Sequence, residues 1–167
     1  IIVFILQTML DKSFTANFML ISKDVLIRPW ILLTHMFLHA NGNHLFWNMF
    51  ALFMFGPILE QRIGAKRFLL IYLASGIIAG IATSLPIFGY TAALGASGAI
   101  MGMLGALIIL MPNLRLLFFF IIPMPLWVAG IIWTGLDLYG YFNPSGVGNV
   151  AHLVGLGVGL LYGYYLR

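Results

Sequence analysis

The chain has no cysteine among its 167 residues, and only 7% of its residues are charged. The absence of cysteine excludes disulfide bonds, thiolate metal sites and a cysteine nucleophile. The scarcity of charge excludes more, because soluble domains carry about 25% charged residues. With 62% hydrophobic residues, the chain has too little polar surface to cover a water-soluble globule. It is therefore predicted to be an integral, multi-pass membrane protein with the lipid bilayer as its partner.

Strong net charge and internal boundaries are also missing. The formal net charge is +4 and the basic residues are scattered, so nothing indicates a nucleic-acid partner. No linker or repeat divides the chain, so residues 1–167 are predicted to form a single domain. Residues 1–10 are too short to span a bilayer and lack a signal-peptide cleavage pattern. We interpret them as the end of a truncated first span.

Apolar runs predict five further spans, and hence an all-α fold. Their approximate ranges are 44–59, 68–85, 95–111, 116–136 and 149–167. The run over 116–136 is expected to kink at Pro123 and Pro125. Residues 11–43 are too polar to span and are predicted to form interfacial helices and turns. The fold class is thus a six-transmembrane-helix bundle, with the first span truncated at the N-terminus.

Basic residues indicate the orientation of this bundle. In a six-span topology, one side carries the short loops and the chain end that contain Arg62, Lys66, Arg67, Arg115 and Arg167. The short loops of the opposite side, 86–94 and 139–148, contain no lysine or arginine. The positive-inside rule therefore predicts cytoplasmic termini. The predicted location is the plasma membrane.

Uncharged polar residues lie near the outer ends of three predicted spans: His44 and Asn48, then Ser97, then His152. Measured along each helix from its cytoplasmic end, Asn48, Ser97 and His152 lie at a similar height of roughly 21–22 Å. Polar groups inside spans are costly and commonly functional. Each residue alone is also explained by an interhelical hydrogen bond, but their matched depth favours a shared site.

Small residues predict which helices touch at that depth. His152 shares a stripe with Gly155, Gly159 and Gly163, and Ser97 begins the glycine-rich run of its own helix. Such faces let membrane helices approach closely. The two faces in contact would bring a histidine beside a serine, which is the geometry of a nucleophile and its general base.

Four strings together resemble the rhomboid intramembrane serine proteases. They are HANGNHLFWN (39–48), EQR (60–62), GASGAIMG (95–102) and AHLVG (151–155), and they occur in the family's order. The match extends from about Arg28 to the C-terminus. The resemblance implies a catalytic dyad of Ser97 as nucleophile and His152 as base. It also implies an oxyanion site made by the side chains of His44 and Asn48 with the Ser97 backbone N–H.

The resemblance carries further expectations. It assigns three residues to holding the first loop, namely His39, Glu60 and Arg62. It also expects, four residues after the serine, an aromatic ring stacked on the base, where this chain has Met101. Asp137 follows the predicted fifth span, and we interpret it as a structural or interfacial group outside the dyad.

The predicted function is cleavage of single-span transmembrane substrates near the outer membrane face by a serine endopeptidase without metal or cofactor. Because the site lies below the surface, the fifth helix, with Trp127 and Trp133, and the loop 141–148 are expected to move. One alternative is a metal-dependent membrane protein built on His35, His39 and His44, although Met36 occupies the position of the glutamate in a zinc-hydrolase motif. Another is a catalytically weak or inactive relative that binds membrane clients, although the chain retains both Ser97 and His152.

Overall fold

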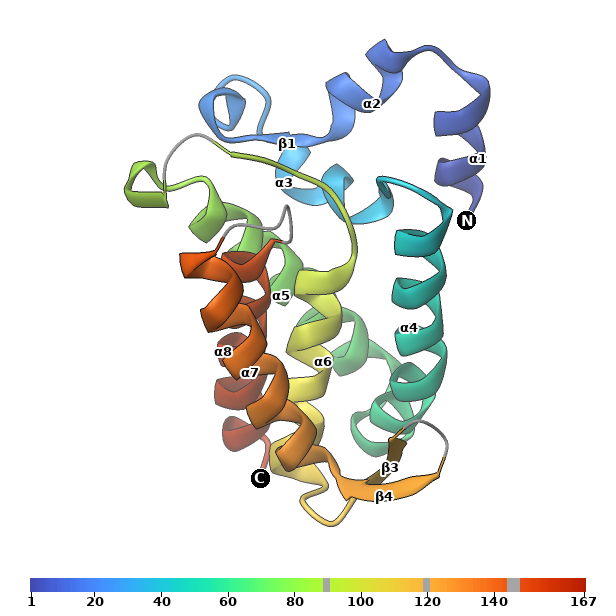
Figure 1. Ribbon diagram of the computed structural model, residues 1–167, viewed down its shortest axis with the longest axis vertical. Coiled ribbons are helices and arrows are strands. Elements are labelled where there is room, and N and C mark those ends of the chain that lie inside the picture. The colour runs from blue at the N-terminus through green and yellow to red at the C-terminus, as the bar shows by residue number, and fades with distance from the viewer. Residues whose placement is uncertain (89–90, 119–120, 144–147) are drawn as a thin grey trace.

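A bundle of helices surrounds α6 in the computed structural model, which describes residues 1–88, 91–118, 121–143 and 148–167 (Figure 1). The helices around it are α4 (Gly42–Ile63), α5 (Ala65–Thr83), α7 (Leu126–Phe142) and α8 (Asn149–Tyr165), α6 itself is Ser97–Leu110, and α1 (Ile2–Met9) lies beside the first loop at the upper end of Figure 1. Each of the five predicted apolar runs overlaps one of the helices α4 to α8. The chain is thus mostly helical, as predicted.

The first loop covers one end of this bundle, the upper end in Figure 1. It contains α2 (Lys12–Phe18), β1 (Leu20–Ile21), η1 (Ser22–Asp24), α3 (Ile31–Thr34) and η2 (His35–Phe37). β1 pairs antiparallel with β2 (Ala92–Ala93), which follows η3 (Pro86–Phe88). Beside this pair, the Thr91 backbone N–H donates to Ser22 Oγ over 2.9 Å. The first loop is therefore joined to the segment that leads into α6.

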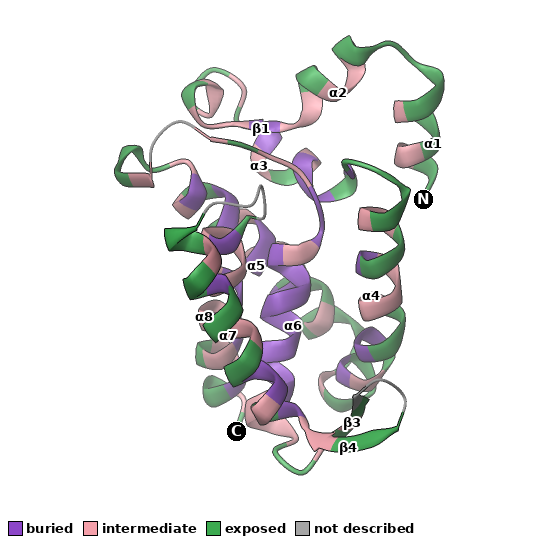
Figure 2. Ribbon diagram, viewed as in Figure 1, coloured by how far each residue is buried: buried purple, intermediate pink, exposed green. Residues whose placement is uncertain are grey.

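The core lies along α6. Figure 2 shows that most of this helix is buried, whereas α4 and α7 alternate between buried and exposed residues. Met103, Ala106 and Leu107 on α6 have no exposed surface. An apolar helix that is covered on all sides belongs at the centre of a bundle, and this position holds both ends of α6 fixed.

Glycines bring α6 and α8 into backbone contact. A Cβ atom on Gly155 or Gly159 of α8 would collide with the carbonyl of Gly98 or Gly102 on α6. A Cβ on Gly105 of α6 would meet the carbonyl of Leu156 in return. The predicted contact between the two small-residue faces is therefore confirmed.

The predicted span over 116–136 is wrong in about its first half. There β3 (Arg115–Phe118) pairs antiparallel with β4 (Ile122–Pro125), with Leu116 opposite Met124. Pro123 and Pro125 lack an N–H and disfavour helical backbone in the residues before them, so the helix begins only at Leu126. Instead of a kinked helix, the chain has a hairpin followed by a shorter helix.

The number of membrane spans stays a prediction. Within the described ranges, α5 alone combines the length and the apolar composition needed to cross a bilayer, and α6 is apolar but shorter. The basic residues nevertheless lie as the charge pattern predicted. The end of α4, the start of α5, the β3–β4 hairpin and the C-terminus all lie at the lower end of Figure 1, opposite the first loop.

Candidate active site

Ser97 and His152 meet at the upper ends of α6 and α8. Ser97 is the first residue of α6, and the structure gives no side-chain cap at the start of this helix. Its hydroxyl lies 2.8 Å from His152 Nε2. Both side chains are half-buried. The predicted proximity of the two residues is confirmed, because backbone contact between the helices carries their first turns together.

Asp137 forms the third member of this hydrogen-bonded chain. Its Oδ1 lies 2.9 Å from His152 Nδ1, and its side chain is 9% exposed against 19% for the histidine. A carboxylate accepts the Nδ1–H, which leaves Nε2 free to accept from the Ser97 hydroxyl. The interpretation of Asp137 as a group outside the site is therefore wrong. Because α7 continues to Phe142, past the predicted end at residue 136, Asp137 lies within the helix and not beyond its end.

His44 lies against the turn that leads into Ser97. Asn41 caps α4 by accepting from the His44 backbone N–H over 2.9 Å, and His44 Nδ1 accepts from the Ala40 N–H over 3.3 Å. Gly95 has φ +127°, and a Cβ there would lie 2.7 Å from His44 Cε1. Only glycine tolerates this backbone conformation. The imidazole can therefore pack on the backbone two residues before the serine.

Asn48 is buried one turn further along α4. Its Nδ2 donates to the His44 carbonyl over 2.8 Å, and its Oδ1 has no partner among the described residues. An amide carries two N–H donors, so one remains for a further acceptor. At the start of α6, the first N–H groups lack intrahelical partners and carry the positive end of the helix dipole. The site thus has donors able to stabilise a developing negative charge.

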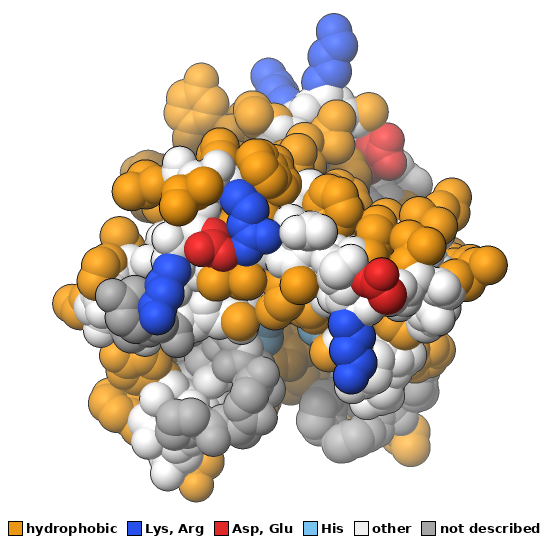
Figure 3. Space-filling model, turned by 90° about the horizontal axis from the view of Figure 1, so that it is seen from above, with side chains coloured by type: hydrophobic (Ala, Val, Ile, Leu, Met, Phe, Trp, Pro, Cys, Tyr) orange, Lys and Arg blue, Asp and Glu red, His pale blue; other side chains and the backbone are white. Residues whose placement is uncertain are grey.

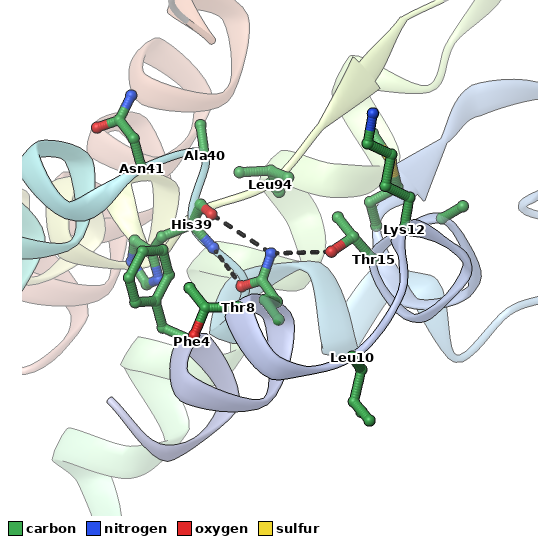
Figure 4. Close-up of a pocket in the computed structure, with 12 residues that line it drawn as sticks. Phe4, Thr8, Leu10, Lys12, Thr15, His39, Ala40, Asn41 and Leu94 are labelled. Atoms are coloured by element: carbon green, nitrogen blue, oxygen red, sulfur yellow. Dashed lines mark hydrogen bonds between the residues drawn. The ribbon is translucent and has the colours of Figure 1, made fainter.

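Gln7 of α1 holds the loop before α4 through the backbone of His39 (Figure 4). Gln7 accepts from the His39 N–H over 3.0 Å and donates to the His39 carbonyl over 3.3 Å. This contact lines a cavity of about 550 Å³ between α1, α2 and the loop. The His39 ring is 4% exposed and lies edge-on to His44, with centroids 5.2 Å apart. Burial lowers the pKa of His39 to about 4, so the ring beside His44 is neutral at physiological pH.

The structure also places the other residues that the sequence singled out. Glu60 and Arg62 lie in the last turn of α4, opposite the first loop, so their expected role in holding that loop is wrong. Trp127 is the second residue of α7 and lies far from the site, whereas Trp133 packs on the core. Met101 is buried in that core. Of the loop 141–148, residues 144–147 lie outside the described residues.

The alternative prediction of a metal site rests on His35, His39 and His44. His35 Nδ1 lies 2.8 Å from the Ile31 carbonyl, and its own carbonyl accepts from the Gly95 N–H over 2.9 Å. In the part of the chain that the structure describes, no three His, Asp or Glu side chains are grouped to hold a metal. Seen from the first-loop end, histidine lies deep between hydrophobic side chains (Figure 3).

Comparison with known proteins agrees with this architecture. The Rhomboid domain model matches residues 27–167. The chain belongs to the rhomboid family. Rhomboid protein 1, mitochondrial, of Saccharomyces cerevisiae is 34% identical over 92% of this chain and 46% of its own length. Rhomboid protease GluP of Bacillus subtilis is 40% identical over 76% of this chain and 24% of its own length. Rhomboid protease GlpG of Haemophilus influenzae is 30% identical over 81% of this chain and 68% of its own length.

These relatives also bear on location. The chain spans less than half the length of the yeast relative and of GluP. As a rhomboid domain, it is an integral membrane protein. The yeast relative is mitochondrial, so the predicted location in the plasma membrane is not supported.

Proposed function

We propose that this rhomboid domain is an intramembrane serine endopeptidase that cleaves single-span transmembrane proteins near the outer membrane face. The observation that carries the proposal is the 2.8 Å contact between Ser97 Oγ and His152 Nε2. It joins the hydroxyl to a base on a neighbouring helix, as a nucleophile requires. Two of the relatives described above are themselves called rhomboid proteases.

In the proposed reaction, the Ser97 hydroxyl gives its proton to His152 Nε2 as Oγ attacks the scissile carbonyl carbon. The carbonyl oxygen becomes an oxyanion, which the Asn48 amide, the His44 ring and the Ser97 backbone N–H stabilise. His152 then gives the proton to the leaving amine, and the C–N bond breaks. A water molecule hydrolyses the resulting acyl-enzyme by the same steps, which regenerates Ser97.

The proposed substrate enters from the membrane. Helices α4 to α8 cross the bilayer, α1 is the end of a truncated first span, and the termini are cytoplasmic, so the site lies towards the outer face. α7 exposes most of its length and buries four residues, and its Asp137 contacts His152, so displacing α7 would open a path from the lipid to the site. A transmembrane segment enters beside α7 and unwinds towards Ser97.

The test compares Ser97→Ala and His152→Ala with the wild-type protein, purified in detergent and incubated with a single-span protein. Both variants should remain folded and lose cleavage, and Ser97→Ala should lose labelling by a fluorophosphonate. Ser84→Ala is the matched control, because the Ser84 hydroxyl donates to its own helix at the Gly80 carbonyl. Cleavage that persists in Ser97→Ala would exclude this serine as the nucleophile.

A further inference from the structure

Asp137 is unusual among the acidic residues of the chain. The chain has four of them. Asp11 caps α2, Asp24 pairs with Arg28, and Glu60 is exposed. Asp137 is buried instead, within a helix whose other buried residues are apolar. A carboxylate in such surroundings costs free energy unless it is hydrogen-bonded, and the partner that the structure gives it is His152.

We propose that Asp137 is a positioning residue that holds His152 in the protonation and orientation that catalysis requires. This inference rests on the proposed function. His152 can carry its single neutral-state proton on either ring nitrogen, but only the Nδ1–H form leaves Nε2 free to accept from Ser97. The Asp137 carboxylate accepts the Nδ1–H and so selects that form.

The same contact acts during the reaction. When Nε2 takes the Ser97 proton, the ring becomes a cation between the carboxylate and the attacking oxygen. The negative charge of Asp137 then stabilises this cation without taking a proton itself. Asp137 touches His152 and not the reacting atoms, so its removal should lower kcat and leave KM nearly unchanged.

The experiment measures kcat and KM for Asp137→Asn and Asp137→Leu with a cleavable single-span protein in detergent. Asparagine keeps the shape of the side chain but loses the charge, and its amide can present a donor to Nδ1. Leucine removes the hydrogen bond and suits the apolar helix. We expect both variants to lower kcat roughly 100- to 10,000-fold, with KM changed less than about threefold.

Thr134→Val is the matched control. Thr134 lies one turn earlier on α7, and its hydroxyl donates to the Gly130 carbonyl of its own helix. This variant should retain wild-type kcat. If Asp137→Asn and Asp137→Leu are folded and keep kcat within about threefold of wild type, the positioning role is wrong. A loss of thermal stability in these variants without a loss of kcat would also show that the positioning role is wrong.

Nitrogen-15 NMR of histidine-labelled protein gives a readout that does not need activity. The chain has four histidines, and the His152 signals are assigned by their absence in His152→Ala. Wild-type His152 should be the Nδ1–H form, and Asp137→Leu should lose this preference. An Nε2–H form in the wild type would overturn the inference. The proposed function fails separately, when cleavage survives Ser97→Ala.

Discussion

At the scale of single residues, Asn48 and His44 provide a test of the proposed oxyanion site. We expect Asn48→Ala and His44→Ala each to lower kcat by roughly 10- to 1000-fold, because preorganised donors act on the transition state in a site with little water. Labelling of Ser97 by a fluorophosphonate should persist, since the nucleophile and base are unchanged. Steady-state kinetics with a membrane substrate measures the effect.

Asn43→Ala is the control for these variants, because Asn43 lies in the same first turn of α4 but is exposed. A change confined to KM would move Asn48 or His44 from the oxyanion site to substrate binding. If all three variants keep the wild-type kcat, neither Asn48 nor His44 takes part in the proposed mechanism.

Most of the candidate site could be predicted residue by residue, but Asp137 could not. Asn48, Ser97 and His152 could be predicted because their heights along straight helices can be counted from the sequence. The role of Asp137 depended on where its helix ends, and the predicted span stopped one residue before it. One usable signal was present: a carboxylate close to an apolar span is a functional candidate by default. Met101 left the base without the aromatic contact expected from the family, and the structure shows that base donating a hydrogen bond to Asp137.

At the scale of helices, the contact between α6 and α8 predicts that alanine substitutions at two glycines of α8 affect stability differently. Gly159→Ala places a methyl group against the Gly102 carbonyl, and such overpacking typically costs about 1–3 kcal/mol. Gly157→Ala on the same helix meets nothing within 4 Å, and helical alanine is favoured over glycine by about 0.5–1 kcal/mol. We expect thermal unfolding in detergent to show destabilisation by the first and none by the second.

Because the α6–α8 contact carries the Ser97–His152 pair, Gly159→Ala should also reduce cleavage. If both glycine variants unfold at the wild-type temperature, the backbone contact between these helices does not limit stability. This would contradict the packing described for the core.

The helices could be predicted from the sequence and the strands could not. Apolar runs bounded by polar residues mark α4, α5, α6 and α8 to within a few positions, but α7 begins ten residues later than its apolar run. Residues 116–126 are apolar throughout, so they have no alternation that would reveal β3 and β4. The pairing of β1 with β2 joins residues about 70 positions apart in the sequence. No local pattern contains that information, because it depends on how the whole first loop folds back.

At the scale of the whole molecule, the absence of cysteine makes the membrane orientation directly measurable. Leu26→Cys places a thiol in the first loop, where Leu26 is 96% exposed, and Lys66→Cys places one at the opposite, basic end. We expect a membrane-impermeant maleimide to label Leu26→Cys in sealed, right-side-out vesicles of the membrane that holds the protein. It should label Lys66→Cys only after permeabilisation, because basic loops stay on the cytoplasmic side. The cysteine-free parent chain measures background, and the reverse labelling pattern would show the opposite orientation.

The glycine contact between α6 and α8 has a mechanical consequence. Helices that touch backbone to backbone leave no layer of flexible side chains between them to be compressed. α6 is also shielded from lipid by its neighbours (Figure 2). Thinning, tension or curvature of the bilayer therefore acts little on the distance between Ser97 and His152. α7 faces outward along most of its length, so the same forces reach the Asp137–His152 contact first. The membrane can thereby tune the orientation of the base while the spacing of nucleophile and base stays constant.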